Sequence, residues 1–300
     1  MITGAQGFIG GALWNHLRTR HSHLKLYGVD VKLPCPSPFL RVCDLSRKKK
    51  FKEILGEFKP DVIFHLAGGR PLDESRLWRA NVLPTQTLLE AVYEMKDLRP
   101  CIVIPGSAAE YGKVQVPQRP ISEVTQPRPA ALYGFVKYVQ TRSGLMYVRR
   151  GLDVRIARIF NILGYATPPT LALGNFAAQI VRIEKKEQPP FLKVGNLSGR
   201  RDFLDIEDVC SALWAVAQKG KRGEVYNVCS GRLLSLRLLL PKLLEHSKVK
   251  NIEIREEQKA PSETFDIVGS NAKIKRTTGW RPAVGIKQSL KNTLQSYRDK

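Results

Sequence analysis

The sequence lacks a long hydrophobic run. No apolar segment approaches the ~20 residues that a membrane-spanning helix needs, and the first residues contain no hydrophobic stretch of the kind that directs secretion. We therefore expect a cytoplasmic protein that does not contact a membrane.

Cysteine and histidine are scarce and unpatterned. The 300 residues include five cysteines, an odd number, and no two of them form a Cys-x-x-Cys pair. Such spacing implies neither a disulfide framework nor a zinc site. His21 and His23 flank a serine without an acidic or sulfur partner nearby in the sequence, so we expect no metal site.

Acidic residues are few, because 27 aspartates and glutamates stand against 49 lysines and arginines, which gives a formal net charge of +22. The basic residues occur in short runs scattered along the chain, without interleaved aromatic residues or a nucleic-acid-binding motif. The positive electrostatic field of such a protein would attract any anionic partner, a nucleotide-sugar as well as RNA. We expect most of these side chains to be solvated surface and do not expect specific nucleic-acid binding.

What the sequence does contain is a glycine-rich segment at its start, Thr3-Gly4-x-x-Gly7-x-x-Gly10. A short apolar stub precedes it and apolar residues at helical spacing follow it, so the segment predicts a strand, a turn and a helix. Gly4 would allow the tight turn, Gly7 the close approach of a pyrophosphate, and Gly10 close packing of the helix against the sheet. The phosphates would lie at the helix N-terminus, where free N–H groups favour anions. A purely structural loop is the alternative.

The next predicted strand, residues 24–30, ends in a carboxylate, Asp30. Dinucleotide-binding folds place the residue that binds the adenosine ribose hydroxyls at this point. A carboxylate there would repel a 2′-phosphate, so we expect NAD(H) as the cofactor rather than NADP(H), although the nearby Lys32 would oppose that preference. The alternative role for Asp30 is that of an ordinary turn residue.

Apolar strands alternate with helical patterns over the first two-thirds of the chain. Residues 61–66 and 101–104 are predicted to form buried parallel strands, and residues 77–95 and 131–149 to form crossover helices. This alternation is typical of an α/β fold, a doubly wound parallel sheet of the Rossmann type.

The chain also predicts a division into two parts. Proline and glycine become frequent at residues 164–174, as in a loop that enters a second lobe. We expect residues 1–163 to form the NAD(P)-binding Rossmann domain, completed by about 201–230. Residues 164–200 and 231–300 would form a smaller C-terminal substrate-binding lobe.

A second motif, Tyr133-x-x-x-Lys137, is predicted to lie on the helix 131–149. One helical turn separates the two side chains, so the ammonium, helped by the cationic nicotinamide of an oxidised cofactor, can lower the pKa of the phenol. Tyr133 can then exchange a proton with an oxygen of a bound substrate. Ser107, at the carboxyl end of its predicted strand, can donate a hydrogen bond to the same oxygen.

These motifs, taken in order, resemble the extended short-chain dehydrogenase/reductase family, specifically its nucleotide-sugar epimerases, dehydratases and ketoreductases. The residues that carry the resemblance span nearly the whole chain: Thr3-Gly4-x-x-Gly7-Phe8-x-Gly10, Asp30, Asp44-Leu45, His65-Leu66-Ala67-Gly68, Asn81, Ser107 with Tyr111-Gly112, Tyr133-x-x-x-Lys137, Asn161 and Arg201-Asp202-Phe203. The second half looks most like the GDP-4-keto-6-deoxy-mannose reductases and their GDP-mannose dehydratase relatives.

The resemblance implies roles for individual residues. The catalytic residues would be Ser107, Tyr133 and Lys137. The cofactor-binding residues would be Gly4, Gly7, Phe8, Ile9, Gly10, Asp30, Asp44, Leu45, Leu66, Ala67, Gly68, Asn81, Tyr133 and Lys137. The substrate, a nucleotide-diphosphate sugar, would contact Ser107, Asn161, Arg201 and Glu263, with the guanidinium holding the diphosphate. The resemblance also implies a homodimer.

The chain departs from the family pattern at two positions. Relatives commonly carry an arginine where this chain has Ala260, so either Lys259 substitutes or the diphosphate is held less tightly. Dehydratases of the family place an acidic residue where this chain has Ala109, and Glu110 should point to the opposite face of an extended segment. We therefore do not expect elimination of water from the sugar.

The sequence thus predicts an enzyme, an NAD(H)-dependent oxidoreductase that acts at C4 of a nucleotide-diphosphate sugar. Reduction of a GDP-4-keto-6-deoxyhexose is the first interpretation, and 4-epimerisation with tightly bound NAD is the alternative. A family member repurposed as an RNA-binding or scaffold protein is a remote third, because such a protein has no need of the Ser-Tyr-Lys set.

Overall fold

A parallel sheet of seven strands forms the centre of the computed structural model, which describes residues 1–32, 37–69, 73–113, 120–257 and 266–300. Along this sheet the strands follow the order β10-β6-β5-β4-β1-β2-β3. Their bounds are β1 Ile2–Thr3, β2 Gly28–Asp30, β3 Leu40–Val42, β4 Val62–His65, β5 Cys101–Ser107, β6 Asp153–Ile159 and β10 Val225–Val228. The strand order reverses beside β1, and sheets of this kind bind ligands at the carboxyl ends of the strands near such a reversal.

The central strand β5 is paired and buried along its length. It lies opposite β6 over seven positions, from Cys101 opposite Asp153 to Ser107 opposite Ile159, and on its other side it pairs with β4. All residues between Cys101 and Ser107 are buried. The amino-terminal half of β5 is therefore paired on both sides, and its carboxyl end, up to Ser107, is held by β6.

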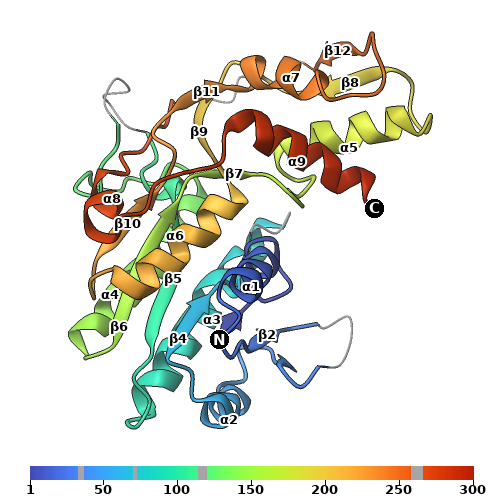
Figure 1. Ribbon diagram of the computed structural model, residues 1–300. Coiled ribbons are helices and arrows are strands. Elements are labelled where there is room, and N and C mark those ends of the chain that lie inside the picture. Colours follow the sequence, from blue (N-terminus) through green and yellow to red (C-terminus); the bar gives the residue numbers. More distant parts are fainter. Residues whose placement is uncertain (33–36, 70–72, 114–119, 258–265) are drawn as a thin grey trace.

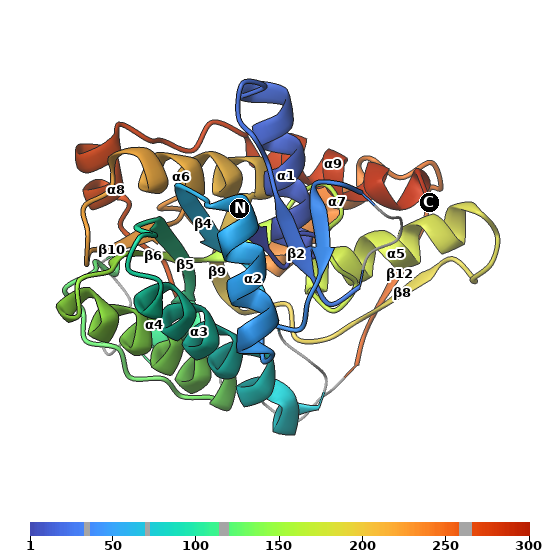
Figure 2. The same cartoon turned by 90° about the horizontal axis from the view of Figure 1, so that it is seen from below.

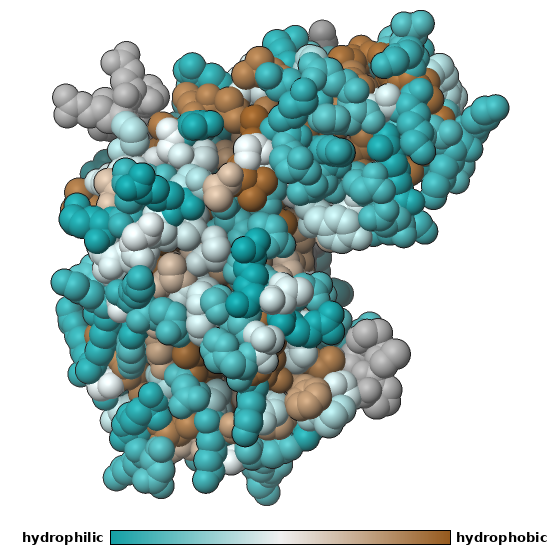
Figure 3. Space-filling model, in the orientation of Figure 1, coloured by the Kyte–Doolittle hydropathy of each residue, from teal (hydrophilic) through white to brown (hydrophobic). Residues whose placement is uncertain are grey.

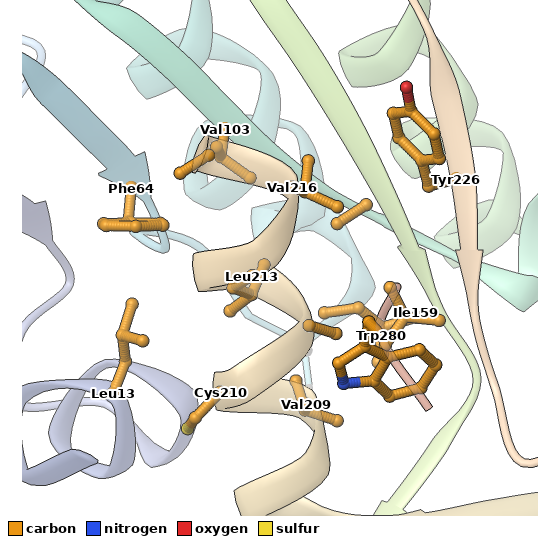
Figure 4. Close-up of a cluster of buried hydrophobic side chains, with 14 of the residues drawn as sticks. Leu13, Phe64, Val103, Ile159, Val209, Cys210, Leu213, Val216, Tyr226 and Trp280 are labelled. Carbon is orange, nitrogen blue, oxygen red and sulfur yellow. The ribbon is translucent and has the colours of Figure 1, made fainter. Parts of the chain in front are cut away.

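Helices cover both faces of the sheet, as Figures 1 and 2 show. One face carries α1 (Phe8–Arg20), α6 (Ile206–Lys219) and the short α8 (Ala272–Thr278), and the other carries α2 (Lys48–Phe58), α3 (Leu77–Glu94) and α4 (Leu132–Arg149). An apolar core fills the space on each face. Figure 4 shows the core beneath α1 and α6, where Leu13, Phe64 and Leu213 meet. The expected doubly wound α/β fold is confirmed.

A smaller lobe packs beside the carboxyl ends of the strands. Its sheets consist of β7 (Asn161–Leu163), β9 (Arg200–Asp205) and β11 (Leu233–Ser235), and of β8 (Phe191–Val194) with β12 (Glu253–Glu256). Its helices are α5 (Ala172–Glu184), α7 (Leu236–Leu244) and α9 (Ile286–Arg298), which share a core of their own. Figure 3 shows that the surface is hollowed between this lobe and the large sheet.

Most predicted elements are present, with differences in the length of two strands, since β5 runs on from Ile104 to Ser107 and β2 is shorter than predicted. The helices predicted at 77–95 and 131–149 are α3 and α4, and the strands predicted at 61–66 and 101–104 are β4 and β5. The strand predicted at residues 24–30 is extended only from Gly28 onward. Ile2, the first residue of β1, lies opposite Gly28, so residues 24–27 have no residue of β1 opposite them to pair with. Within the described residues, no helix is both long and apolar enough to cross a bilayer.

Candidate functional site

The glycine segment forms a tight crossing of β1, α1 and the loop after β4. Gly4 has a φ of +68°, and a Cβ atom there would lie 2.6 Å from both the nitrogen of Ala67 and the carbonyl oxygen of Leu66. A Cβ atom at Gly10 would lie 2.0 Å from the carbonyl oxygen of Gly4. Gly7 precedes the first turn of α1, whose N–H groups lack intrahelical partners. Side chains at these positions would therefore separate the segments that meet at the start of α1.

A cavity of about 940 Å³ opens beside this crossing, and we call it the Asp30 cavity. Many of the predicted cofactor residues line it: Gly4, Gly7, Asp30, Asp44, Leu45, Leu66, Ala67 and Gly68. The carboxylate of Asp30 accepts hydrogen bonds from the backbone nitrogens of Gln6 (2.8 Å) and Val31 (2.7 Å), which fix it at the end of β2. Such a cavity, with a helix N-terminus and a fixed carboxylate, suits an adenosine diphosphate group.

A smaller cavity of about 160 Å³, the Ser107 cavity, adjoins the Asp30 cavity through the loop after β4. Ile9, Asn81, Ser107, Tyr133 and Lys137 all contribute to its lining. The structure therefore brings together the predicted catalytic residues, which are far apart in the sequence.

The predicted cofactor residues Asn81, Phe8 and Gly10 do not line the Asp30 cavity. Asn81 is 1% exposed; its amide exchanges hydrogen bonds with the backbone of Gly69 (3.1 and 2.9 Å) and so holds the loop after β4 in place. Phe8 lines a third cavity on the far side of Ser107. Gly10 lines none of these cavities and serves the packing of α1.

Ser107 and Tyr133 line the same cavity because α4 packs tightly against the turn after β5. The Ser107 hydroxyl oxygen accepts the backbone N–H of Ala109 (3.2 Å), which leaves its own proton for another acceptor. A Cβ atom at Gly134 would lie 2.3 Å from the carbonyl oxygen of Ala109, so only glycine lets α4 lie this close to the turn after β5.

Lys137 is a buried cation. Its side chain is 6% exposed, and its ammonium donates a hydrogen bond to Oε1 of Gln140, one turn further along α4. Burial lowers the pKa of Lys137 to about 8, and the nearby carboxylate of Glu110 opposes this shift. The ammonium therefore loses its proton at a pH closer to neutrality than that of an exposed lysine does, which suits a group that supports proton transfer.

A chain of buried hydrogen bonds continues from Gln140 through α3. The Gln140 amide nitrogen donates to the hydroxyl of Thr85 (2.8 Å), and that hydroxyl donates to the carbonyl oxygen of Asn81 (2.7 Å). Nε2 of His65 also lies 2.9 Å from the Thr85 hydroxyl. Thr85 thus links the helix that carries Lys137 to the residue that holds the loop after β4.

The same chain defines the protonation of His65. Burial lowers its pKa to about 3, so the ring is neutral near pH 7. Because the single proton of Thr85 goes to Asn81, Nε2 of His65 must carry the ring hydrogen. Nδ1 then accepts the hydroxyl of Thr3 (2.9 Å), whose oxygen in turn accepts the N–H of Ala67 (3.3 Å). Every group of the chain between Lys137 and Ala67 is satisfied.

The third cavity, the Arg201 cavity, has a volume of about 580 Å³ and shares Ser107 and Tyr133 with the Ser107 cavity. Asn161 and Arg201, both predicted to bind substrate, also line it. Asn161 donates to the carbonyl oxygen of Asp202 (3.1 Å), and Arg201 to that of Arg200 (2.9 Å). Burial lowers the pKa of the Arg201 guanidinium, although the group stays charged at neutral pH.

The Arg201 cavity continues into the smaller lobe. It shares Leu171, Ala172 and Leu236 with a further cavity of about 740 Å³, the Arg182 cavity, whose lining includes Arg182 and Lys193. The lining of this cavity comes from α5, β8 and the chain after β12 and carries no sequence motif, so the cavity could not be predicted from the sequence. The predicted substrate residue Glu263 and the neighbouring Lys259 and Ala260 lie outside the described residues.

One expectation about the turn after β5 is wrong. Ala109 and Glu110 do not continue the extended strand but form the 3-10 helix η2 (Ala108–Glu110). Ser107 and Glu110 form a capping box there, so the Glu110 carboxylate folds back to the Ser107 backbone nitrogen and is fully buried. Ala109 does line the Arg201 cavity, and among the described residues that line it there is no aspartate, glutamate or histidine.

Comparisons with known proteins agree with this geometry. The model of the NAD dependent epimerase/dehydratase family matches residues 1–229. GDP-6-deoxy-D-mannose reductase of Pseudomonas aeruginosa is 31% identical over 307 residues, which covers 100% of this chain and 97% of that protein. GDP-6-deoxy-D-talose 4-dehydrogenase of Aggregatibacter actinomycetemcomitans is 24% identical and covers 86% of this chain and 83% of its own length. The solved structure of RMD from Pseudomonas aeruginosa with NADPH has a TM-score of 0.86 and 30% identity, covering 99% and 98% of the two chains.

We predict that Thr85→Val lowers kcat by roughly tenfold, because Gln140 loses its anchor and Lys137 its fixed orientation. The variant should also unfold about 2 kcal/mol more easily, since two buried donors lose their acceptor. Steady-state kinetics and denaturant unfolding measure the two effects.

Thr293→Val is the matched control. Thr293 is equally buried, donates to a carbonyl one turn earlier on its helix (2.8 Å) and accepts the N–H of Gly164 (3.0 Å), but it lies in the smaller lobe. It should lose comparable stability and keep the parent kcat. A folded Thr85→Val enzyme with the parent kcat would show that the buried chain does not position Lys137.

Proposed function

Because the chain belongs to the NAD dependent epimerase/dehydratase family, we propose that it reduces the 4-keto group of a nucleotide-diphosphate sugar with NADH. The family expected from the motifs is thereby confirmed. One observation carries the proposal: Ser107, Tyr133 and Lys137 meet in the cavity that joins the Asp30 and Arg201 cavities. A cofactor on one side and a sugar on the other would both reach these residues.

The residues perform the proton transfer of such a reduction. The reduced nicotinamide, when bound, supplies the hydride to the sugar carbon. Tyr133 donates its phenolic proton to the oxygen that becomes a hydroxyl, and Ser107 donates a hydrogen bond to the same oxygen. Lys137, buried and held by Gln140, stabilises the phenolate that forms.

The Arg201 cavity supports reduction or epimerisation rather than elimination of water. Elimination across C5 and C6 requires a base at C5 and an acid for the departing hydroxyl. The described lining of this cavity offers no carboxylate or imidazole, and Ala109, the position at which the resemblance implies the dehydratase acid, is part of that lining. Transient oxidation at C4 uses the same three residues, so 4-epimerisation is the second candidate function.

Substrate recognition would extend over two cavities. Asn161 and Arg201 lie where the diphosphate would pass, and the Arg182 cavity beyond them provides room and positive charge for the nucleoside. Glu263 stays a predicted ribose contact on the strength of the resemblance alone. We further infer that the protein acts in the cytoplasm, on the sequence features that led to this expectation.

The cofactor we propose is NAD(H). Asp30 is fixed by two backbone N–H groups at the edge of its cavity, where a carboxylate can accept the adenosine ribose hydroxyls. It would repel a 2′-phosphate at that point. Lys32, Arg76 and Arg79 line the same cavity and oppose this repulsion, so the preference is one of degree.

We also propose a homodimer formed through α3 and α4. These helices pack side by side, and several large apolar side chains on them are exposed: Trp78, Leu83, Tyr93, Leu132, Phe135 and Met146. On α4 the exposed apolar residues are 3 and 11 positions apart and therefore lie on one face. Such a patch is typical of an interface between proteins.

The proposed function is tested by following the products with NMR. With NADH and GDP-4-keto-6-deoxy-mannose, we expect the 4-hydroxy sugar and an equal amount of NAD⁺. Tyr133→Phe should lose roughly 10² to 10⁴ of this rate and bind cofactor within a few-fold of the parent. Conversion of GDP-mannose to a 4-keto-6-deoxy sugar would overturn the proposal. Formation of 4-epimers without net consumption of NADH would favour epimerisation, the second candidate function. Salt-resistant binding of a specific RNA without any turnover would favour a family member repurposed as an RNA-binding protein.

The cofactor preference is tested with Asp30→Ala. Loss of a hydrogen bond to a charged group costs about 1.5 to 3 kcal/mol, so kcat/KM for NADH should fall roughly tenfold or more while that for NADPH rises. Asp97→Ala, an exposed aspartate in the turn after α3, is the control and should change neither value. A parent enzyme that uses NADPH better than NADH would refute the preference.

The dimer is tested with Met146→Glu. A charge in the centre of an apolar interface is left desolvated and unpaired, so the variant should be monomeric at concentrations where the parent is a dimer. Val124→Glu is the control, because Val124 is also apolar and exposed but lines a cavity beside β10 and α8, with Glu224 and Lys273. Light scattering after gel filtration gives the masses, and a dimer that survives the Met146 change would place the interface elsewhere.

A further inference from the structure

Glu110 is a fully buried carboxylate beside the site that the proposed reaction does not use. One of its oxygens, Oε1, accepts the backbone N–H of Ser107 (2.7 Å) and the hydroxyl of Thr141 (3.1 Å). The other, Oε2, accepts Nε (3.1 Å) and Nη2 (2.8 Å) of Arg158. Arg158 itself is 3% exposed. A buried charge pair of this kind is costly to assemble and needs complete hydrogen bonding to be tolerated.

The four donors come from three elements that surround the reacting groups. Ser107 ends β5, Thr141 lies on α4 one turn after Lys137, and Arg158 lies on β6 opposite Gly106. A Cβ atom at Gly106 would lie 2.6 Å from Oε1 of Glu110, so the glycine makes room for the carboxylate. Glu110 therefore joins the strand that carries the serine to the helix that carries the tyrosine and the lysine.

The pair is closed off from the cavities. The Arg158 guanidinium lies 4.5 Å from the centre of the Tyr111 ring, and the Tyr111 hydroxyl donates to Asn227 (2.7 Å). Glu110 lines neither the Ser107 cavity nor the Arg201 cavity. It cannot serve as an acid or base toward the sugar from this position.

We propose that Glu110 is a positioning residue, which fixes Ser107 against α4 and, from within its ion pair with Arg158, places a negative charge one helical turn from Lys137 through its hydrogen bond with Thr141. The proposal rests on the proposed function, because it concerns the same three catalytic residues. Its two parts make different predictions. Loss of the fixed backbone affects kcat, whereas loss of the charge affects the pH at which Lys137 gives up its proton.

The charges around Lys137 define the direction of the pH effect. Among the described residues, the titratable groups that interact with the Lys137 ammonium are Glu110 of η2 and the neutral His65 of β4, and Glu110 is itself paired with Arg158 of β6. Glu110 supplies the negative charge that raises the pKa of Lys137. Removing it therefore lowers that pKa further below about 8, and activity that needs the ammonium is lost at a lower pH.

The test compares Glu110→Gln with Glu184→Gln. Glu184 has a similar set of donors in the smaller lobe, although it is less deeply buried: Arg298 donates to it from Nε (2.9 Å) and Nη2 (2.6 Å), and the backbone N–H of Lys248 donates at 2.8 Å. Both variants should lower Tm. Only Glu110→Gln should lower kcat, by roughly tenfold with KM within about twofold, and move the alkaline limb of kcat/KM down by roughly one pH unit.

A milder variant and a substrate-free measurement accompany it. Thr141→Val removes one donor to Glu110 and keeps the ion pair, so it should fold and lower kcat without moving the pH limb. In protein labelled with ¹³C at lysine Cε, the Lys137 signal, assigned with Lys137→Met, should titrate at lower pH in Glu110→Gln. This titration needs no substrate and can be measured even if the parent does not turn over the sugar. Failure of the proposed function can therefore be distinguished from failure of the proposal about Glu110.

Two results would overturn the proposal. One is a folded Glu110→Gln enzyme with the parent kcat and pH profile, or with losses no larger than those of Glu184→Gln. The other is a Lys137 signal that titrates at the same pH in parent and variant. If Glu110→Gln does not fold, an unchanged kcat in Thr141→Val refutes the positioning role, and a lowered kcat supports it.

Discussion

Burial of the Lys137 ammonium is the constraint on which the rest of the site depends. A cation that is 6% exposed has lost most of its water, and the surrounding protein must supply hydrogen bonds and opposite charge in its place. Gln140 supplies the hydrogen bond, and Glu110, itself paired with Arg158, contributes a nearby negative charge. Each of these must itself be satisfied in the interior, so the requirement spreads outward to Thr85 and Arg158.

Two sets of buried hydrogen bonds, one through Gln140 and one through Glu110, connect the cofactor side and the substrate side of the site. Through Gln140 and Thr85 the lysine is tied to Asn81 and the loop that borders the Asp30 cavity. Through Glu110, α4 is tied to the serine at the end of β5. A cofactor and a sugar would therefore meet at groups whose relative positions are set by the interior of the protein and not by mobile surface loops.

The sequence was informative where local geometry determines the role of a residue and uninformative where tertiary contacts do. Gly4 and Gly10 could be predicted because only glycine fits a left-handed turn or a contact of this closeness. Glu110 was misread as part of an extended segment, although Ser107 followed three positions later by a glutamate is the pattern of a capping box. The role of Thr85 depends on how α3 lies against α4, which no local pattern contains.

The scarcity of acidic residues has a structural counterpart. Several of the aspartates and glutamates that the chain does have are buried and accept backbone N–H groups where segments meet. Asp202 accepts from Ser230, Gly231 and Gly269 and so holds two loops of the smaller lobe to β9. Because these carboxylates are buried, even fewer acidic side chains remain on the surface to offset its lysines and arginines. The net charge of +22 makes the long-range field of the protein positive, which favours the approach of a diphosphate and weakens as salt screens it.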